Sequence, residues 1–229
     1  MRELTVAVPA YNEEESVERV VEELLIKIPT FVEDFELLFV NDGSTDRTGE
    51  ILDELAARHE SVRVVHHDRN QGFPGVVFTL IRNTKKQVYT GISADGEVNV
   101  DDLSKMLDKI IEGYDVVIGV RNQKPNYNRY RKIVSWSYNK SVELLFGVNF
   151  RDIGSTKMYR TEVFKHIDTR SNSAFINAEY LVKASRLGYK IGFVDIVQRP
   201  RLGGTAKGAV FRSVRNCAID LLRFWRDSR

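Results

Sequence analysis

Short apolar runs alternate with longer amphipathic stretches over the first 120 residues of the chain. The apolar runs, rich in Val, Ile, Leu and Phe, predict strands at about residues 4–9, 36–41, 62–66, 87–93 and 115–119. The stretches between them predict helices at about residues 13–28, 46–59, 74–84 and 101–112. This alternation predicts an α/β fold with a mostly parallel central sheet and helices on both of its faces.

Local signals mark the ends of the first two predicted helices. Asn12 is placed to cap the first helix, and the glutamates at 13–15 then fall in its first turn, where carboxylates suit the helix dipole. Pro29 is expected to end this helix. Ser44 or Thr45 is the expected cap of the second helix.

The pattern changes after residue 120, because residues 121–132 are polar, basic and rich in Asn, which predicts a loop. The elements expected to follow are a helix at about 131–146, a short segment near 155–160, helices near 161–166 and 176–187, and a strand near 190–197. We therefore divide the chain into one domain over residues 1–208 and a basic amphipathic helix over residues 209–229. Apolar residues at helical spacing between arginines are typical of a helix at a membrane interface, and also of a helix that packs on a core.

Composition restricts the class of protein. With 229 residues, 42% of them hydrophobic, the chain can bury a full core. The net charge is only +2, but residues 1–60 are mainly acidic and residues 199–229 mainly basic, so the basic end could meet an anionic partner or simply be a solvated surface. Nucleic acid is disfavoured, since aromatic residues are not interleaved with the basic positions.

The expected location is the cytoplasm, with any membrane contact peripheral and on the cytosolic face. Cys217 has no second cysteine to pair with, and no charged and apolar leader precedes Leu4. No apolar run approaches the roughly 20 residues that a spanning helix needs.

Polar, carboxylate-bearing segments follow the first two predicted strands. Carboxyl ends of parallel strands form the edge at which open α/β folds bind ligands. An apolar wall with carboxylates suits a nucleoside, and this edge offers the set Pro9, Tyr11, Glu13, Val40 and Asp42. In the alternative interpretation Asn12 and Asp42 only cap helices and Tyr11 only packs.

No glycine-rich phosphate loop is present, since neither G-x-G-x-x-G nor G-x-x-x-x-G-K-[ST] occurs in the chain. A dinucleotide dehydrogenase and a P-loop enzyme are therefore disfavoured. A diphosphate would have to be neutralised by a metal ion or by basic side chains. Asp95 and Glu97, at the end of the fourth predicted strand, could both reach one hard cation, or could belong to an ordinary turn.

Five segments together carry a specific resemblance. They read Val-Pro-Ala-Tyr-Asn-Glu-Glu at 8–14, Val-Asn-Asp-Gly-Ser-Thr-Asp at 40–46, Asn-Gln-Gly at 70–72, Arg-Asp-Ile-Gly-Ser-Thr-Lys-Met-Tyr-Arg at 151–160 and Arg-Leu-Gly-Gly-Thr-Ala-Lys at 201–207. The chain resembles a family two glycosyltransferase of the GT-A fold, above all the dolichyl-phosphate mannose synthase and bacterial polyprenyl-phosphate glycosyltransferase group. This resemblance extends from residue 4 to about residue 208.

The resemblance implies roles for individual residues. The nucleotide-sugar donor, a GDP- or UDP-sugar, would be held by Pro9, Tyr11, Glu13, Val40, Asp42, Ser93, Ala94, Asp95, Arg121, Arg201 and Lys207. Mg²⁺ or Mn²⁺ would be held by Asp95 and Glu97, and the acceptor phosphate by Arg131 and Ser135. Catalysis would rest on Asp95, Arg121, Arg131 and Asp152.

The implied reaction is a metal-dependent, inverting transfer of a mannose- or glucose-like sugar to dolichyl or undecaprenyl phosphate. A phosphate acceptor is already anionic and needs no base, whereas a glycan hydroxyl would need one, and Asp152 is the available candidate. Three basic neighbours, Arg151, Lys157 and Arg160, would keep Asp152 ionised and weak as a base, so its alternative role is to orient Arg131 or Lys157.

One segment departs from the family pattern. The family usually reads Asp-Ala-Asp-Leu-Gln at the metal strand, and this chain reads Ser-Ala-Asp-Gly-Glu at 93–97. The formal charge is unchanged and Glu97 is a good ligand for a hard cation, so a metal can still bind. Ser93 also motivates a different interpretation, in which the protein binds a nucleotide sugar with little turnover.

Overall fold

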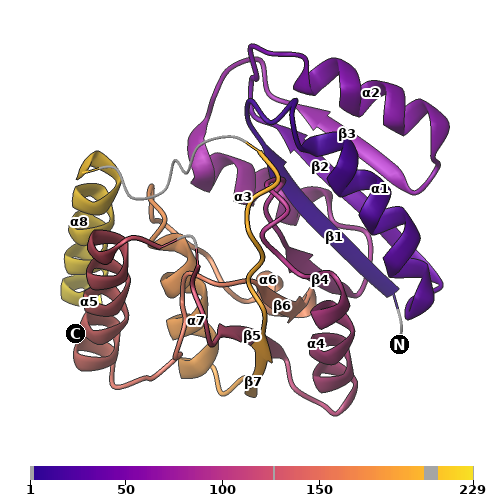
Figure 1. The fold of residues 1–229 in the computed structure, drawn as a ribbon. Coiled ribbons are helices and arrows are strands. Elements are labelled where there is room, and N and C mark those ends of the chain that lie inside the picture. Colours follow the sequence, from indigo (N-terminus) through magenta and orange to yellow (C-terminus); the bar gives the residue numbers. More distant parts are fainter. Residues whose placement is uncertain (1–2, 126, 204–210, 229) are drawn as a thin grey trace.

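The computed structural model describes residues 3–125, 127–203 and 211–228, and a seven-stranded sheet lies at their centre (Figure 1). Its strands stand in the order β3-β2-β1-β4-β6-β5-β7. They are β1 (Glu3–Ala10), β2 (Asp34–Asn41), β3 (Val62–His66), β4 (Val88–Gly91), β5 (Val116–Arg121), β6 (Lys157–Arg160) and β7 (Ile191–Ile196). The predicted mostly parallel sheet is confirmed, with β6 alone antiparallel to both of its neighbours.

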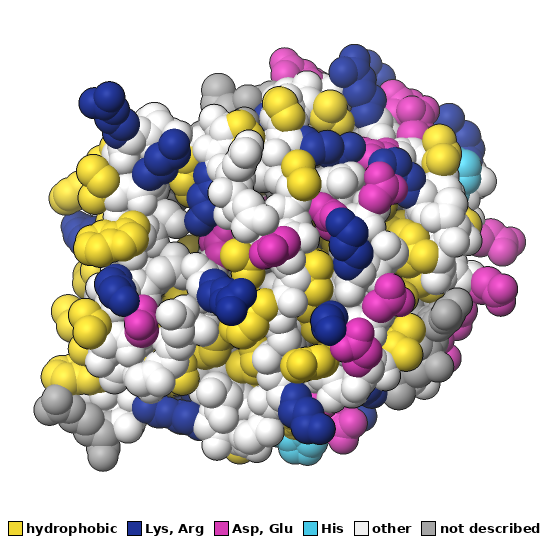
Figure 2. Space-filling model, turned by 60° about the horizontal axis from the view of Figure 1, so that its bottom comes forward, with side chains coloured by type: hydrophobic (Ala, Val, Ile, Leu, Met, Phe, Trp, Pro, Cys, Tyr) yellow, Lys and Arg dark blue, Asp and Glu magenta, His cyan; other side chains and the backbone are white. Residues whose placement is uncertain are grey.

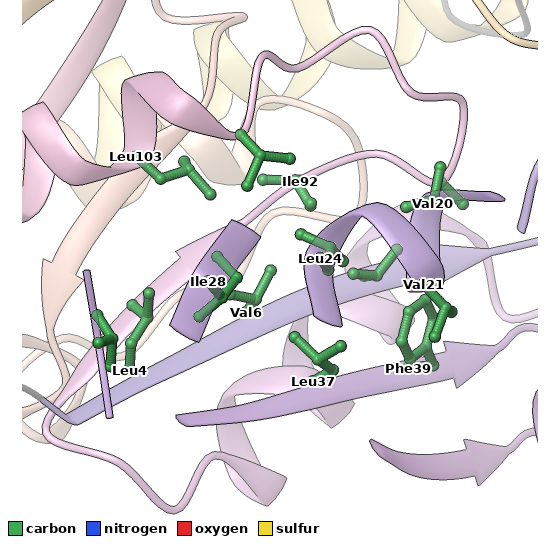
Figure 3. Packing of buried hydrophobic residues seen from close by; sticks show 14 of the residues in the cluster. Leu4, Val6, Val20, Val21, Leu24, Ile28, Leu37, Phe39, Ile92 and Leu103 are labelled. Carbon is green, nitrogen blue, oxygen red and sulfur yellow. The ribbon is translucent and has the colours of Figure 1, made fainter. Parts of the chain in front are cut away.

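Helices cover both faces of this sheet, as predicted. The first face carries α1 (Val17–Lys27), the 3₁₀ turn Ile28–Thr30, α2 (Thr48–Arg58) and α4 (Asp101–Ile111). The second face carries α3 (Gly72–Asn83), α5 (Arg129–Phe146), α6 (Glu162–Lys165), α7 (Ile176–Arg186) and α8 (Phe211–Asp227). Each face has its own apolar core, and Figure 3 shows Leu24 and Ile28 of the first core packed over Val6 and Leu37 of the sheet.

The expected start of the first helix was wrong. α1 begins at Val17, and residues 13–16 form a turn in which the Glu13 carbonyl accepts from the amides of Ser16 and Val17. Asn12 does not cap this helix, because it has a left-handed backbone (φ 50°) and its side-chain oxygen accepts from the Thr45 amide at 2.8 Å. The side chain of Asn12 thus ties the loop after β1 to the loop after β2.

The expected caps of the second helix were also wrong. α2 begins at Thr48, and neither Ser44 nor Thr45 caps it. Instead, the carboxylate of Asp46 accepts from the backbone amide of Thr48 at 3.0 Å. Ser44 does not cap α2, because its hydroxyl accepts a hydrogen bond from the backbone amide of Asn12.

The last helix packs beside α5 on the second face (Figure 1). Its Phe224 lies against Phe146 of α5 and against Phe175, with ring centroids 5.3 and 5.7 Å apart. The side facing away from α5 leaves Phe211 and Leu222 exposed. Within the described residues, no helix is long and apolar enough to cross a lipid bilayer.

Candidate active site

A cavity of about 590 Å³ opens at the carboxyl edge of the sheet and continues over its second face. Eight of the residues singled out in the sequence line it: Pro9, Glu13, Ser93, Asp95, Glu97, Arg121, Arg131 and Arg201. They come from five separate segments between residues 9 and 201. One hollow therefore joins the candidate metal ligands to three of the predicted arginines.

Two buried carboxylates occupy one side of the cavity. The turn after β4 is closed by a hydrogen bond from the Glu97 amide to the Asp95 carboxylate at 3.0 Å. A guanidinium nitrogen of Arg201 lies 2.8 Å from Asp95 and 3.2 Å from Glu97, and the amide of Gln198 donates to Glu97. Arg201 thus balances two like charges that would otherwise repel each other in a buried site.

The donor chemistry of this carboxylate pair fits a divalent cation. Asp95 and Glu97 supply hard oxygen ligands, which Mg²⁺ and Mn²⁺ prefer, and the hydroxyl of Ser93 lines the same cavity. Over the part of the chain that is described, no group of three or more His, Cys, Asp or Glu is placed to hold a metal. A cation at this pair would therefore take further oxygens from water or from a bound diphosphate.

A buried ion pair stands on the other side of the cavity. Arg121 makes two parallel hydrogen bonds of 2.8 Å to the carboxylate of Asp152, and Lys124 lies 3.1 Å from the same carboxylate. Burial alone would raise the pKa of Asp152, but Arg121 and Lys124 outweigh it and hold that pKa below its usual range. Asp152 is therefore a poor general base and a good anchor for Arg121.

The expected partners of Asp152 were wrong. Its carboxylate pairs with Arg121 and Lys124, not with Arg131 or Lys157, because the end of β5 brings residues 121–124 over the loop that precedes β6. Tyr127 was not singled out as a site residue. Its hydroxyl accepts from Arg121 at 3.2 Å, and its ring lies 4.1 Å under the guanidinium of Arg131, so it sets the two arginines side by side.

Several predicted donor residues lie outside the residues that line the cavity. Asp42 is buried, accepts from the amides of Gln71 and Gly72 at 2.8 and 3.0 Å, and pairs with His67 at 2.7 Å. It therefore anchors the loop that leads into α3. The other predicted residues not lining the cavity are Tyr11, which is half-buried, Val40 and Ala94, whose side chains are fully buried, Ser135, half-buried on α5, and the buried Asp152. Lys207 falls outside the described residues.

Gly43 offers a test of the anchored loop beside Asp42. Its φ is +66°, and a Cβ there would lie 2.6 Å from backbone atoms of Arg69 and Asn70. We expect Gly43→Ala to lower the free energy of unfolding by about 3 kcal/mol, through backbone strain and overpacking. Chemical denaturation measures this loss. The control is Gly147→Ala, with φ +71° and open space around the added carbon, which should cost only about 1 kcal/mol; equal losses in both variants would contradict the packing argument.

The fold is that of nucleotide-sugar transferases of the GT-A type, as expected. A solved structure of glucosyl-3-phosphoglycerate synthase from Mycobacterium tuberculosis, in complex with Mn²⁺, UDP-glucose and phosphoglyceric acid, superposes with a TM-score of 0.77. That match covers 98% of this chain and 80% of the synthase at 17% identity, so it speaks for the fold alone. The chain itself belongs to glycosyl transferase family 2, whose sequence model matches residues 5–168.

Two curated relatives align over nearly the whole chain. It is 27% identical to glycosyltransferase AglD of Haloferax volcanii, over 97% of this chain but only 37% of AglD. It is 29% identical to an undecaprenyl-phosphate mannosyltransferase of Micrococcus luteus, over 90% of this chain and 87% of the relative. The chain thus spans about a third of the length of the first relative and most of the second.

Proposed function

We propose that the protein is an inverting hexosyltransferase that moves a sugar from a nucleoside-diphosphate sugar to a polyprenyl phosphate. The observation that carries this proposal is a single cavity lined by two carboxylates, Asp95 and Glu97, and by a cationic group formed by Arg121 and Arg131. Both reactants would be anionic, and a site that joins them must neutralise each one. The name of the Micrococcus luteus relative, an undecaprenyl-phosphate mannosyltransferase, supports the same reaction class.

The donor would lie on the side of the two carboxylates. Pro9 and Glu13 line the cavity near the expected nucleoside position. Arg201 can donate to a phosphate oxygen once its carboxylate partners bind a cation. Mg²⁺ or Mn²⁺, when bound by Asp95 and Glu97, supplies the positive charge that stabilises the departing nucleoside diphosphate. The remaining donor contacts proposed from the family pattern are Tyr11, Val40, Asp42, Ala94 and Lys207.

The acceptor phosphate would lie on the side of Arg121 and Arg131, with Ser135 proposed beside them. Its oxygen is already a nucleophile, so the site has only to align it with the anomeric carbon, opposite the leaving diphosphate. One displacement of this kind inverts the configuration at that carbon. The ionised state of Asp152 suits such a site, since no proton has to be removed from the acceptor.

A membrane surface is the proposed source of the acceptor. Six large apolar side chains among the described residues stand at least half exposed on α5 and α8: Tyr130, Ile133, Trp136, Leu144, Phe211 and Leu222. Figure 2 shows hydrophobic side chains gathered along the edge formed by these helices (left), with Lys and Arg among them. Apolar side chains among cations are suited to peripheral contact with anionic lipid at the cytosolic face.

Product formation with defined acceptors tests the function. The full chain is incubated with Mn²⁺, labelled UDP- or GDP-sugars and a short polyprenyl phosphate, and the expected product is an acid-labile, lipid-linked sugar. Label on a saccharide acceptor instead would support the glycan hydroxyl reaction. Donor-induced thermal stabilisation with no product from any donor would support a nucleotide-sugar binding module.

Ser93 is the observation that favours the binding module, and its replacement distinguishes the two proposals. Ser93→Asp adds a third carboxylate to the cavity that holds Asp95 and Glu97. For an active transferase we expect roughly tenfold tighter Mn²⁺ activation, since a hard cation gains one anionic ligand. The Mn²⁺ dependence of the initial rate measures this, with Ser93→Asn as the uncharged control. Transfer activity that is absent in the natural chain and is detected only in Ser93→Asp would contradict the transferase proposal.

A further inference from the structure

Four buried side-chain atoms on described residues that line the cavity have no hydrogen-bond partner, and they belong to Arg131, Tyr138, Ser155 and Gln198. Two of them are the hydroxyl of Ser155 and one terminal guanidinium nitrogen of Arg131, both shielded from solvent. Ser155 is 8% exposed and lies in the loop that leads into β6. Buried polar groups are normally satisfied, so these unpaired groups in one cavity indicate a missing anionic or polar ligand.

Lys157 lies beside them and is equally short of partners. Its ammonium donates to the backbone carbonyl of Ser155 at 2.8 Å, and no ion pair joins it to any described carboxylate. It is 6% exposed. A lysine is rarely buried in this way without a counter-charge, because transfer of an ammonium out of water is costly.

The strand register explains how Lys157 reaches the cavity. Lys157 pairs with Gly91 of β4, and its side chain shares the second face of the sheet with Tyr89 and Tyr159. Gly91 has no side chain, and Tyr89 lies against it, since a Cβ at Gly91 would be 3.3 Å from the Tyr89 hydroxyl. Lys157 therefore stands at a strand position that would normally face the apolar core, and there it lines the cavity.

Among the described residues, Lys157 has no carboxylate of its own. Desolvation lowers the pKa of Lys157 to about 7, while Asp152 raises it and Arg121 lowers it further. The cavity is also lined by ionisable groups from other parts of the fold, namely Glu13, Tyr89, Asp95, Glu97, Arg121, Tyr127, Arg131, Tyr138, Tyr180 and Arg201, and by Tyr159 on β6 itself. Asp95 and Glu97 are paired with Arg201. The carboxylate that acts on Lys157 is Asp152, which Arg121 and Lys124 already share.

From this arrangement we infer that Ser155 and Lys157 form, with the unpaired nitrogen of Arg131, an inner subsite for the phosphate of the acceptor. The inference rests on the proposed function in so far as the acceptor is a phosphate monoester. The donor diphosphate belongs to the other side of the cavity, at Arg201, whereas Lys157 interacts with the Arg121 and Asp152 pair. An arriving phosphate supplies the missing counter-charge, so the neutral amine of Lys157 takes up a proton from solvent as the acceptor binds.

Calorimetric titration of the full chain with farnesyl phosphate tests the subsite. Titrations at pH 8 in two buffers of different ionisation enthalpy count the protons taken up, and we expect close to one. In Lys157→Met the proton uptake should vanish and the affinity for farnesyl phosphate should fall at least tenfold. Ser155→Ala should weaken binding a few-fold and leave the proton uptake in place.

Three comparisons show whether the losses belong to the subsite. The melting temperature of Lys157→Met should rise, because a buried amine with few hydrogen-bond partners is replaced by an apolar side chain, so weaker binding cannot come from unfolding. The same change at the exposed Lys105, Lys105→Met, should alter neither affinity nor proton uptake. UDP affinity should be unchanged in Lys157→Met, and a selective loss of UDP binding would overturn the assignment to the acceptor.

Two further outcomes separate this inference from the proposed function. Binding of inorganic phosphate with proton uptake that depends on Lys157, but no binding of farnesyl phosphate, would uphold the subsite and overturn the lipid acceptor. Farnesyl phosphate binding that is equally tight and equally proton-linked in Lys157→Met would overturn the subsite and uphold the acceptor.

Discussion

Asp95→Asn is expected to lower kcat/KM for sugar transfer roughly a thousandfold, because several kcal/mol of charge stabilisation of the leaving diphosphate depend on this carboxylate. The amide keeps the oxygen that accepts from the backbone of Glu97, and Glu97 keeps its contact with Arg201. The turn should therefore stay in place, and the melting temperature should change little. The decrease in kcat/KM therefore measures the contribution of the negative charge of Asp95.

Initial rates over a range of Mn²⁺ concentrations measure this effect. A higher Mn²⁺ requirement together with a lower maximal rate is expected, since the cation loses one of its two protein carboxylates. Asp101→Asn is the matched control, because Asp101 lies at the exposed start of α4 and its carboxylate pairs with Lys27. A transfer rate of Asp95→Asn within threefold of that of the natural chain would contradict the assignment of Asp95 as a metal ligand.

The sheet and its helices could be predicted because buried parallel strands leave a strong local pattern. The runs of β1 and β2 are apolar on both faces, and the amphipathic stretches between strands match α1 and α2 to within a few residues. Direction was not predicted for β6, whose four residues pair with β4 and β5 far away in the chain. Nothing in so short a segment fixes which neighbours it joins.

Residues of the candidate site could be predicted only where they stand in recognisable sequence motifs. Asp95 and Arg201 stand in recognisable motifs, and the structure brings them within 2.8 Å. Asn12 and Asp42 occupy motifs just as recognisable, yet their side chains hold loops together. Local rules such as helix capping cannot separate these roles, because the deciding contacts join residues about thirty positions apart.

Lys157 and Tyr127 were missed as site residues for opposite reasons. Lys157 follows a strand pattern that predicts a core position, and only the three-dimensional structure shows that it borders a cavity. Tyr127 lies in a polar loop without periodicity, where no pattern indicates that its ring lies under Arg131. The surroundings of both residues are determined by tertiary contacts between β5, β6 and α5.

Asp152→Asn is expected to lower the free energy of unfolding by about 4 kcal/mol at neutral pH, because it leaves Arg121 buried with no carboxylate. The sign of the pH dependence follows from the lowered pKa of Asp152 in the folded state. The pair stabilises the fold at pH values above the unfolded pKa, near 3.8, and this stability is lost as the pH falls through the lower folded pKa. Denaturation of the two proteins should therefore converge in strong acid.

Transfer to polyprenyl phosphate by Asp152→Asn should fall about a hundredfold, because Arg121 loses one of its two parallel hydrogen bonds and the charge that aims it into the cavity. The control is Asp115→Asn, which removes a looser contact of 3.7 Å to Arg160 and should cost under 1 kcal/mol with little change in rate. A positioning role predicts that stability and transfer fall together and that the pH profile of the residual activity keeps its shape. Full stability with complete loss of activity and of the acidic limb of that profile would instead mark Asp152 as a general base, and would favour a hydroxyl acceptor over a phosphate.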